Sequence, residues 1–178
     1  IHQTVEGARV KGYTFPNGAD VIPGSAVPDG LAAVLSGHIH RAQVLDRDLG
    51  GRALAAPVYY PGSVERTSLA ERDEAKGFMI LEFEADARRG GRLVKNTFHK
   101  LPARPMFAVA IDASGLGAAT LSETIQRELE ALPGDAVVQL RVGGELVPEA
   151  AEMIRAARLR AMHPPTMTVD LRYRRAGG

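Results

Sequence analysis

Two prolines within four residues, Pro102 and Pro105, separate two different sequence patterns. Before them, short apolar runs alternate with turns rich in Gly, Pro and Asp, which is typical of β-strands. After them, strand patterns alternate with two stretches of helical periodicity, which predicts a β-α-β-α-β order. Because proline restricts φ and stiffens a short connection, we expect a domain boundary here, with domains at 1–101 and 102–178.

The first hundred residues are predicted to be mostly β, opening with loops over residues 1–30. The apolar run at 31–35 is bounded by glycines and predicts a strand buried on both faces. The other strands and turns expected from alternation and turn residues are, in chain order, a strand at 42–45, a turn at 48–51, a strand at 53–60 and a hairpin of strands 77–84 and 92–99 joined through 88–91.

The remaining residues favour a small α/β domain, so the whole chain is expected to be of the α/β (α+β) class. Thr120 and Glu123 have the spacing of a capping box, which predicts a helix ending before Pro133. Pro148 suits the first position of a second helix, which we expect to run to Met162. Strands are expected at 106–111, 137–142 and 167–171.

Composition excludes several classes of protein. None of the 178 residues is a cysteine, so we expect no disulfide framework, thiolate metal site or cysteine nucleophile, and a cytoplasmic location fits. A net charge of +1 does not by itself indicate a nucleic-acid-binding protein. No stretch reaches the roughly 18 apolar residues of a membrane helix, so we expect the chain not to span a membrane.

Histidines cluster near the beginning of the chain. Gly37 precedes His38 and His40, and a glycine permits the turn that would direct both imidazoles at one ion. His2 follows an apolar residue in a pattern that resembles the end of a strand, where ligands gather in α/β sheets. The alternative is a pair of ordinary loop histidines, one of them hydrogen-bonded to the backbone.

Three further motifs follow Ile-His-Gln at 1–3 along the chain. They are Ser-Gly-His-Ile-His at 36–40, Tyr-Pro-Gly-Ser-Val-Glu-Arg at 60–66 and Glu-Ala-Lys-Gly-Phe at 74–78. Together they resemble the last motifs of calcineurin-like metallophosphoesterases. Within that superfamily the chain resembles the DNA double-strand-break repair nucleases, which include the bacterial SbcD-type exonucleases. Residues 135–146 and 157–160 resemble the small cap domain of these nucleases. The resemblance implies the second half of a metallophosphoesterase β-sandwich, followed by a βαβαβ cap or DNA-binding domain.

The resemblance also implies a chemistry and partners. It implies a hydrolase that cleaves DNA phosphodiester bonds at ends, as an exonuclease or endonuclease in DNA repair and recombination. Two divalent ions, expected to be Mn²⁺, would act together, with His2 and His38 on one ion and His40 on the other. The implied partners are DNA, an SMC-like coiled-coil ATPase and a second copy of the nuclease, in a nucleoid-associated cytoplasmic setting.

The family also uses Asp-x-His, Gly-Asp and Gly-Asn-His motifs, which supply carboxylate and Asn ligands and a catalytic His. These motifs precede the position of Ile1 in the family, and none occurs up to Gly51 here. We therefore expect the C-terminal portion of a longer nuclease that is inactive alone, and we assign no catalytic residue within it. The alternatives are a small-substrate phosphodiesterase of the same superfamily and a non-catalytic DNA-binding or scaffolding fragment.

Three residues near the histidines are candidate DNA contacts. The Ser63 hydroxyl, the loop N–H groups beside it and the Arg66 guanidinium could hold a DNA phosphate. Arg41 directly follows the His pair and is a candidate for the same role. The alternative for Arg66 is an ordinary ion pair with Glu65 or Glu71.

Overall fold

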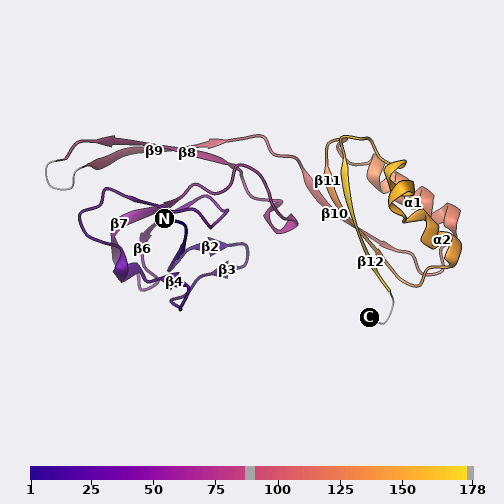
Figure 1. Cartoon of the computed structure of the whole chain (residues 1–178), viewed down its shortest axis with the longest axis horizontal. Helices are drawn as coiled ribbons and strands as arrows, with labels where there is room; N and C mark the ends of the chain where they lie inside the picture. The colour runs from indigo at the N-terminus through magenta and orange to yellow at the C-terminus, as the bar shows by residue number, and fades with distance from the viewer. Residues whose placement is uncertain (87–90, 176–178) are drawn as a thin grey trace. The chain divides into compact units, whose positions relative to one another are not determined.

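The computed structural model describes residues 1–86 and 91–175, which form two compact units, Ile1–Ala103 and Arg104–Gly178 (Figure 1). The division falls within the proline-containing segment in which the sequence places a boundary. The described residues form twelve strands and three α-helices, so the chain is of the mixed α/β class. Each unit is described by itself below.

The first unit is built mainly from short strands. Its elements are, in chain order, β1 (Thr4–Val5), β2 (Arg9–Val10), β3 (Tyr13–Thr14), β4 (Val21–Ile22), the 3-10 turn η1 (Gly24–Ala26), β5 (Val34–Leu35), β6 (Gln43–Arg47), β7 (Ala53–Tyr60), the 3-10 turn η2 (Leu69–Glu71), β8 (Gly77–Glu84) and β9 (Arg92–Lys100). The strand β7 is central, because it pairs in parallel with β5 and antiparallel with β6. The prediction of a strand at 53–60 is confirmed.

Tyr60, at the end of β7, holds residues 3–5 in place through two hydrogen bonds. Tyr60 is fully buried in the core of this unit together with Val5 and Val58. Its hydroxyl donates to the carbonyl of Gln3 at 3.0 Å and accepts from the N–H of Val5 at 2.7 Å. Burial raises the pKa of Tyr60 above its ordinary value, so the phenol stays protonated and can donate. The segment that carries His2 is thereby fixed against β7.

The prediction of a strand buried on both faces at 31–35 is wrong. The strand β5 has only two residues, and Leu35 and Leu31 are 52% and 39% exposed. The cause is its position: in the described three-stranded sheet, whose order is β5-β7-β6, β5 lies at an edge. An apolar run bounded by glycines does not distinguish a central strand from an edge strand.

The strands β8 and β9 form the predicted antiparallel hairpin. Their register runs from Gly77 opposite Lys100 to Glu84 opposite Arg92, with an irregularity after Glu82. The predicted turn at 88–91 lies outside the described residues except for its last position. The hairpin leads directly from the Glu-Ala-Lys-Gly-Phe motif, so the start of β8 also positions that motif.

In the second unit strands alternate with helical segments as predicted, except that two helices stand between the last two strands, where one was expected. Its elements are β10 (Met106–Asp112), α1 (Ala118–Glu130), β11 (Val137–Gly143), α2 (Pro148–Met153), α3 (Ala156–Arg160) and β12 (Thr168–Arg174). All strand pairs are parallel, in the order β10-β11-β12, and the helices lie on one face of the sheet (Figure 1). Leu121, Ile125 and Leu129 of α1 are buried against Val138 and Leu140 of β11.

Two helix predictions in this unit are corrected. The helix α1 begins at Ala118 after Gly117, with no side-chain cap, so the predicted capping box is not formed. The predicted single helix from Pro148 to Met162 is broken at Arg155, whose ψ of 144° is extended. Ala150 and Leu159 are both buried in the same core. In one straight helix, nine residues at about 100° each would place these two on opposite faces, so the break brings both to the core.

None of the helices within residues 1–86 and 91–175 has the length and apolar character that crossing a membrane requires.

Candidate metal and phosphate site

Two segments far apart in the sequence lie side by side at the end of β5. Ile1 donates from its N-terminal group to the carbonyl of Leu35 at 2.8 Å, and its own carbonyl accepts from the N–H of Gly37 at 3.0 Å. The hydroxyl of Ser36, which is buried, donates to the carbonyl of Gln3 at 2.7 Å. The residues flanking His2 are therefore paired with those that lead into His38.

The imidazoles of His2 and His38 are in edge-to-face contact. Their ring centroids lie 5.5 Å apart at an interplanar angle of 74°. His38 has a φ of 75°, and within the described part of the chain no other non-glycine residue has a positive φ. Such a conformation is strained for a residue with a Cβ and is often found at functional sites. A Cβ added to Gly37 would lie 2.6 Å from Nδ1 of His2, so a glycine is needed for this approach.

The separation of the His2 and His38 rings can be compared with that expected for two imidazole ligands of one ion. With metal–nitrogen bonds of about 2.1 Å, two imidazole centroids on a shared ion lie roughly 5–6 Å apart, and the observed separation of 5.5 Å falls within that range. Within residues 1–86 and 91–175, no three His, Asp or Glu side chains are grouped closely enough to hold a metal ion. The ring separation is therefore compatible with a shared ion, and the predicted metal site stays a prediction.

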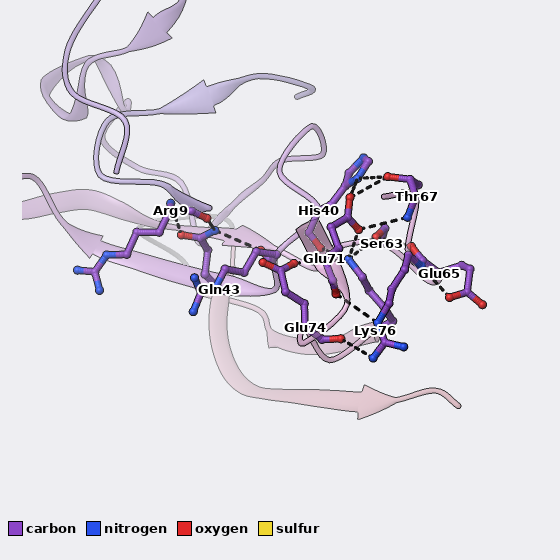
Figure 2. Close-up of polar contacts among 11 residues, drawn as sticks. Arg9, His40, Gln43, Ser63, Glu65, Thr67, Glu71, Glu74 and Lys76 are labelled. Atoms are coloured by element: carbon purple, nitrogen blue, oxygen red, sulfur yellow. Dashed lines mark hydrogen bonds and ion pairs between the residues drawn. The ribbon is translucent and has the colours of Figure 1, made fainter. Parts of the chain in front are cut away.

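His40 makes different contacts from the other two histidines. Its Nδ1 lies 3.1 Å from Oε1 of Glu71 and 3.2 Å from the hydroxyl of Thr67, both on or next to η2 (Figure 2). Neither Glu71 nor Thr67 was among the site residues predicted from the sequence. The sequence carries no local sign of this contact, because 31 residues separate His40 from Glu71.

Lys76 is buried at the base of this cluster. Its side chain has no exposed surface, which is unusual for a lysine. The ammonium group donates to the carbonyl of His40 at 3.0 Å, to Oγ of Ser63 at 2.9 Å and to Oε2 of Glu71 at 2.6 Å (Figure 2). Oε2 of Glu74 lies 3.6 Å away. These three hydrogen bonds use all three hydrogens of the ammonium group.

Glu71 is held in its ionised form. Burial raises the pKa of its carboxyl group, but hydrogen bonds from Lys76, Thr67 and His40 lower it further than burial raises it, to about 2. Glu71 is therefore an anion at neutral pH. The Glu-Ala-Lys-Gly-Phe motif was a sequence signal for this region, although it indicated no role for its lysine.

The three candidate DNA contacts surround the same loop but differ in how they are engaged. The hydroxyl of Ser63 donates to the carbonyl of Glu65 and accepts from Lys76. The guanidinium of Arg66 donates to the backbone carbonyls of Glu71 and Glu74 at 3.2 and 3.1 Å. These contacts brace the η2 loop, and the expected alternative for Arg66, an ion pair with Glu65 or Glu71, stays a prediction.

Arg41 is exposed and borders a cavity of about 330 Å³. Lys11, His38, His40 and Glu71 also line this cavity. Two of the predicted metal ligands and one predicted phosphate contact therefore face one hollow of the first unit. Beside the imidazole groups, the lining of this cavity combines two basic side chains, Lys11 and Arg41, with two carboxylates, Glu71 and Glu74.

Comparison with profiles of known protein families and with curated proteins gives no match to this chain.

Proposed function

We propose that this chain is the C-terminal portion of a Mn²⁺-dependent DNA repair nuclease and contributes the histidine half of its metal centre. The observation that carries the proposal is the contact of His2 with His38, at a centroid separation of 5.5 Å that suits a shared ion. It is supported by the order of the motifs at 36–40, 60–66 and 74–78, which resembles the double-strand-break repair branch of the metallophosphoesterases. Three neutral imidazoles do not balance two dications, so the proposed centre takes its carboxylate ligands from another segment.

The described residues would bind and orient the substrate. When bound, two ions would polarise the phosphodiester and supply hydroxide. Arg41, at the rim of the cavity that His38 and His40 line, would contact a DNA phosphate. Ser63 and Arg66 would act through the loop that they hold, since their side chains already bond to it. The proposed partners follow the same resemblance: DNA, an SMC-like ATPase and a second nuclease copy.

Mn²⁺ binding tests the metal half of the proposal. Calorimetric titration of the 178-residue chain should detect Mn²⁺ binding that weakens at least tenfold in His2→Gln and in His38→Gln. His163→Gln, in the second unit, is the matched control and should leave the affinity unchanged. Equal binding by all four chains would contradict the assignment of His2 and His38 as ligands.

DNA cleavage tests the reaction. The 178-residue chain with Mn²⁺ should not cut duplex DNA ends, whereas the longer parent protein should cut them and lose this activity in His38→Gln. Chelator-sensitive cleavage by the 178-residue chain alone would show that the half-site proposal is wrong.

A second candidate is a phosphodiesterase for a small substrate, which the size of the cavity favours. A volume of about 330 Å³ is at the lower end of the range for small-molecule sites, roughly 300–1,000 Å³. Comparing the parent protein on duplex DNA and on bis(p-nitrophenyl) phosphate separates the two candidates. Turnover of the small ester without cleavage of DNA would favour the second.

A third candidate is a non-catalytic DNA-binding or scaffolding fragment. It is favoured by the finding that no three potential ligands are grouped in the described residues. DNA binding with no Mn²⁺ affinity in the chain, and no cleavage by the parent protein, would support it.

A further inference from the structure

The contacts of His40 define which of its ring nitrogens carries the hydrogen. Nδ1 faces Oε1 of Glu71 at 3.1 Å and the hydroxyl oxygen of Thr67 at 3.2 Å. The Thr67 hydroxyl hydrogen is directed at Oε1 of Glu71, at 2.7 Å, so this hydroxyl presents a lone pair to His40. The carboxylate of Glu71 accepts from the Lys76 ammonium group at 2.6 Å and from the Thr67 hydroxyl at 2.7 Å, so it is paired as an anion and has no hydrogen to donate. Both neighbours of Nδ1 are therefore acceptors.

An Nδ1 without a hydrogen would place its lone pair against two acceptor oxygens, those of Glu71 and Thr67, and this arrangement is repulsive. A hydrogen on Nδ1 turns the same approach into a hydrogen bond to Glu71 with charge assistance. In a neutral imidazole only one nitrogen carries a hydrogen, so Nε2 then presents its lone pair. The geometry thus selects one tautomer.

Lys76 determines where the carboxylate lies. Its ammonium group holds Oε2 of Glu71 at 2.6 Å and, through another hydrogen, the backbone carbonyl of His40 at 3.0 Å. One buried cation therefore fixes both members of the His40–Glu71 contact (Figure 2). Because the Lys76 side chain is fully enclosed, solvent does not compete for these bonds.

We propose that Glu71, oriented by Lys76, is a positioning residue that holds His40 in its Nδ1–H tautomer and leaves Nε2 as the nitrogen that binds a divalent cation. This inference rests on the proposed function for its statement about the cation, whereas the tautomer is independent of any metal. It extends the site from the predicted histidines to a carboxylate and an ammonium group for which no sequence motif indicated a role. Carboxylates that hydrogen-bond to metal-binding imidazoles orient the ring and increase its basicity.

The test is a long-range ¹⁵N–¹H spectrum of the metal-free 178-residue chain at pH 8.5, where imidazole side chains are generally neutral. The His40 signals are assigned by their absence in His40→Gln. The expected pattern is a protonated Nδ1 and an unprotonated Nε2. A hydrogen on Nε2 of His40 in the unsubstituted chain overturns the proposal, and this measurement needs no variant that might misfold.

Glu71→Gln provides a sharper comparison. Lys76 would attract the amide oxygen, so the amide N–H₂ would face His40 and donate to Nδ1. We expect the hydrogen of His40 to move to Nε2 in this variant. Glu74→Gln is the matched control, because it removes a carboxylate 3.6 Å from Lys76 that makes no hydrogen bond to His40, and the tautomer should not change. A tautomer that is the same in Glu71→Gln as in the unsubstituted chain would refute the role of Glu71.

Mn²⁺ titration separates this proposal from the proposed function. If His40 is a ligand, Lys76→Met should weaken Mn²⁺ binding by about 10- to 100-fold relative to Glu74→Gln. Unchanged affinity in Lys76→Met would refute the part of the inference that links the tautomer to the cation. The Nδ1–H tautomer together with no Mn²⁺ binding in any chain would instead refute the proposed function and leave the positioning by Glu71 intact.

Discussion

The ammonium nitrogen of Lys76 lies 2.6 Å from Oε2 of Glu71, and no part of the Lys76 side chain is exposed. A buried charge of this kind requires a partner, since transfer from water is costly for an isolated ion. Each member of the pair is therefore needed by the other, and both hold the loop that carries His40.

Lys76→Met should destabilise the first unit by about 3–5 kcal/mol, because it leaves the Glu71 carboxylate without its cation. The double variant Lys76→Met/Glu71→Gln should be more stable than Lys76→Met alone. Urea unfolding followed by circular dichroism measures both. Lys95→Met is the control: its pair with Glu82 is more than half exposed, so the loss should stay below about 1 kcal/mol. If Lys76→Met also lowered the free energy of unfolding by less than about 1 kcal/mol, the role of the buried pair would be contradicted.

Stability should depend on pH through Glu71. Its pKa in the folded chain is about 2, against an ordinary value of 4.5. A depressed pKa contributes stability that is complete above pH 4.5 and is lost as the pH falls through about 2. The free energy of unfolding should therefore fall less steeply between pH 4.5 and 2 in Glu71→Gln than in the unsubstituted chain. Glu82→Gln, on the exposed hairpin, controls for the loss of a surface carboxylate. An equal slope of unfolding free energy against pH in all three chains would contradict the contribution of Glu71.

Gly37→Ala should separate metal binding from folding. The new Cβ would lie 2.6 Å from Nδ1 of His2, whose exposed ring can swing away at little cost in stability. The free energy of unfolding should change by less than about 1 kcal/mol. Mn²⁺ binding should weaken, because His2 no longer faces His38. Gly18→Ala is the control, since a Cβ there meets nothing within 4 Å. Unchanged Mn²⁺ affinity in Gly37→Ala would argue against the shared ion.

The left-handed conformation of His38 predicts opposite effects of two substitutions. His38→Gly should not destabilise the chain, because glycine adopts a φ of 75° without strain. His38→Val should destabilise it by about 1–2 kcal/mol, since a β-branched residue is disfavoured there. Both variants should lose Mn²⁺ binding. Urea unfolding measures the difference between their stabilities. Equal stability of the two variants would contradict the strained backbone.

DNA affinity of the chain should be directed at phosphates and sensitive to salt. Arg41→Ala should weaken binding equally on unrelated sequences and make the slope of log affinity against log salt shallower by about 0.9. Arg52→Ala is the control, because this exposed guanidinium is paired with Asp48. Fluorescence anisotropy over a salt series measures the slopes. A loss confined to one DNA sequence would mean that Arg41 does not contact phosphate.

The local sequence pattern was sufficient to predict the elements whose conformation depends on residues adjacent in sequence. Alternation and turn residues predicted β7 and the β8–β9 hairpin within a residue or two, and proline placed the start of α2 at Pro148. These features depend on backbone preferences of adjacent residues, which the sequence displays directly. The break at Arg155 was missed, since it arises from the need of Ala150 and Leu159 to reach one core.

The sequence by itself determined the alternation of strands and helical segments in the second unit, the glycine before His38 and the candidate ligands, because each is a matter of residue type and short spacing. Only the tertiary structure decided that His2 lies against His38, and that Lys76 is buried beneath His40 and Glu71. The His40–Lys76 bond joins residues 36 apart in the chain. Such contacts depend on strand pairing and on burial. Lysine is ordinarily exposed, and nothing in the local sequence indicates that Lys76 is buried.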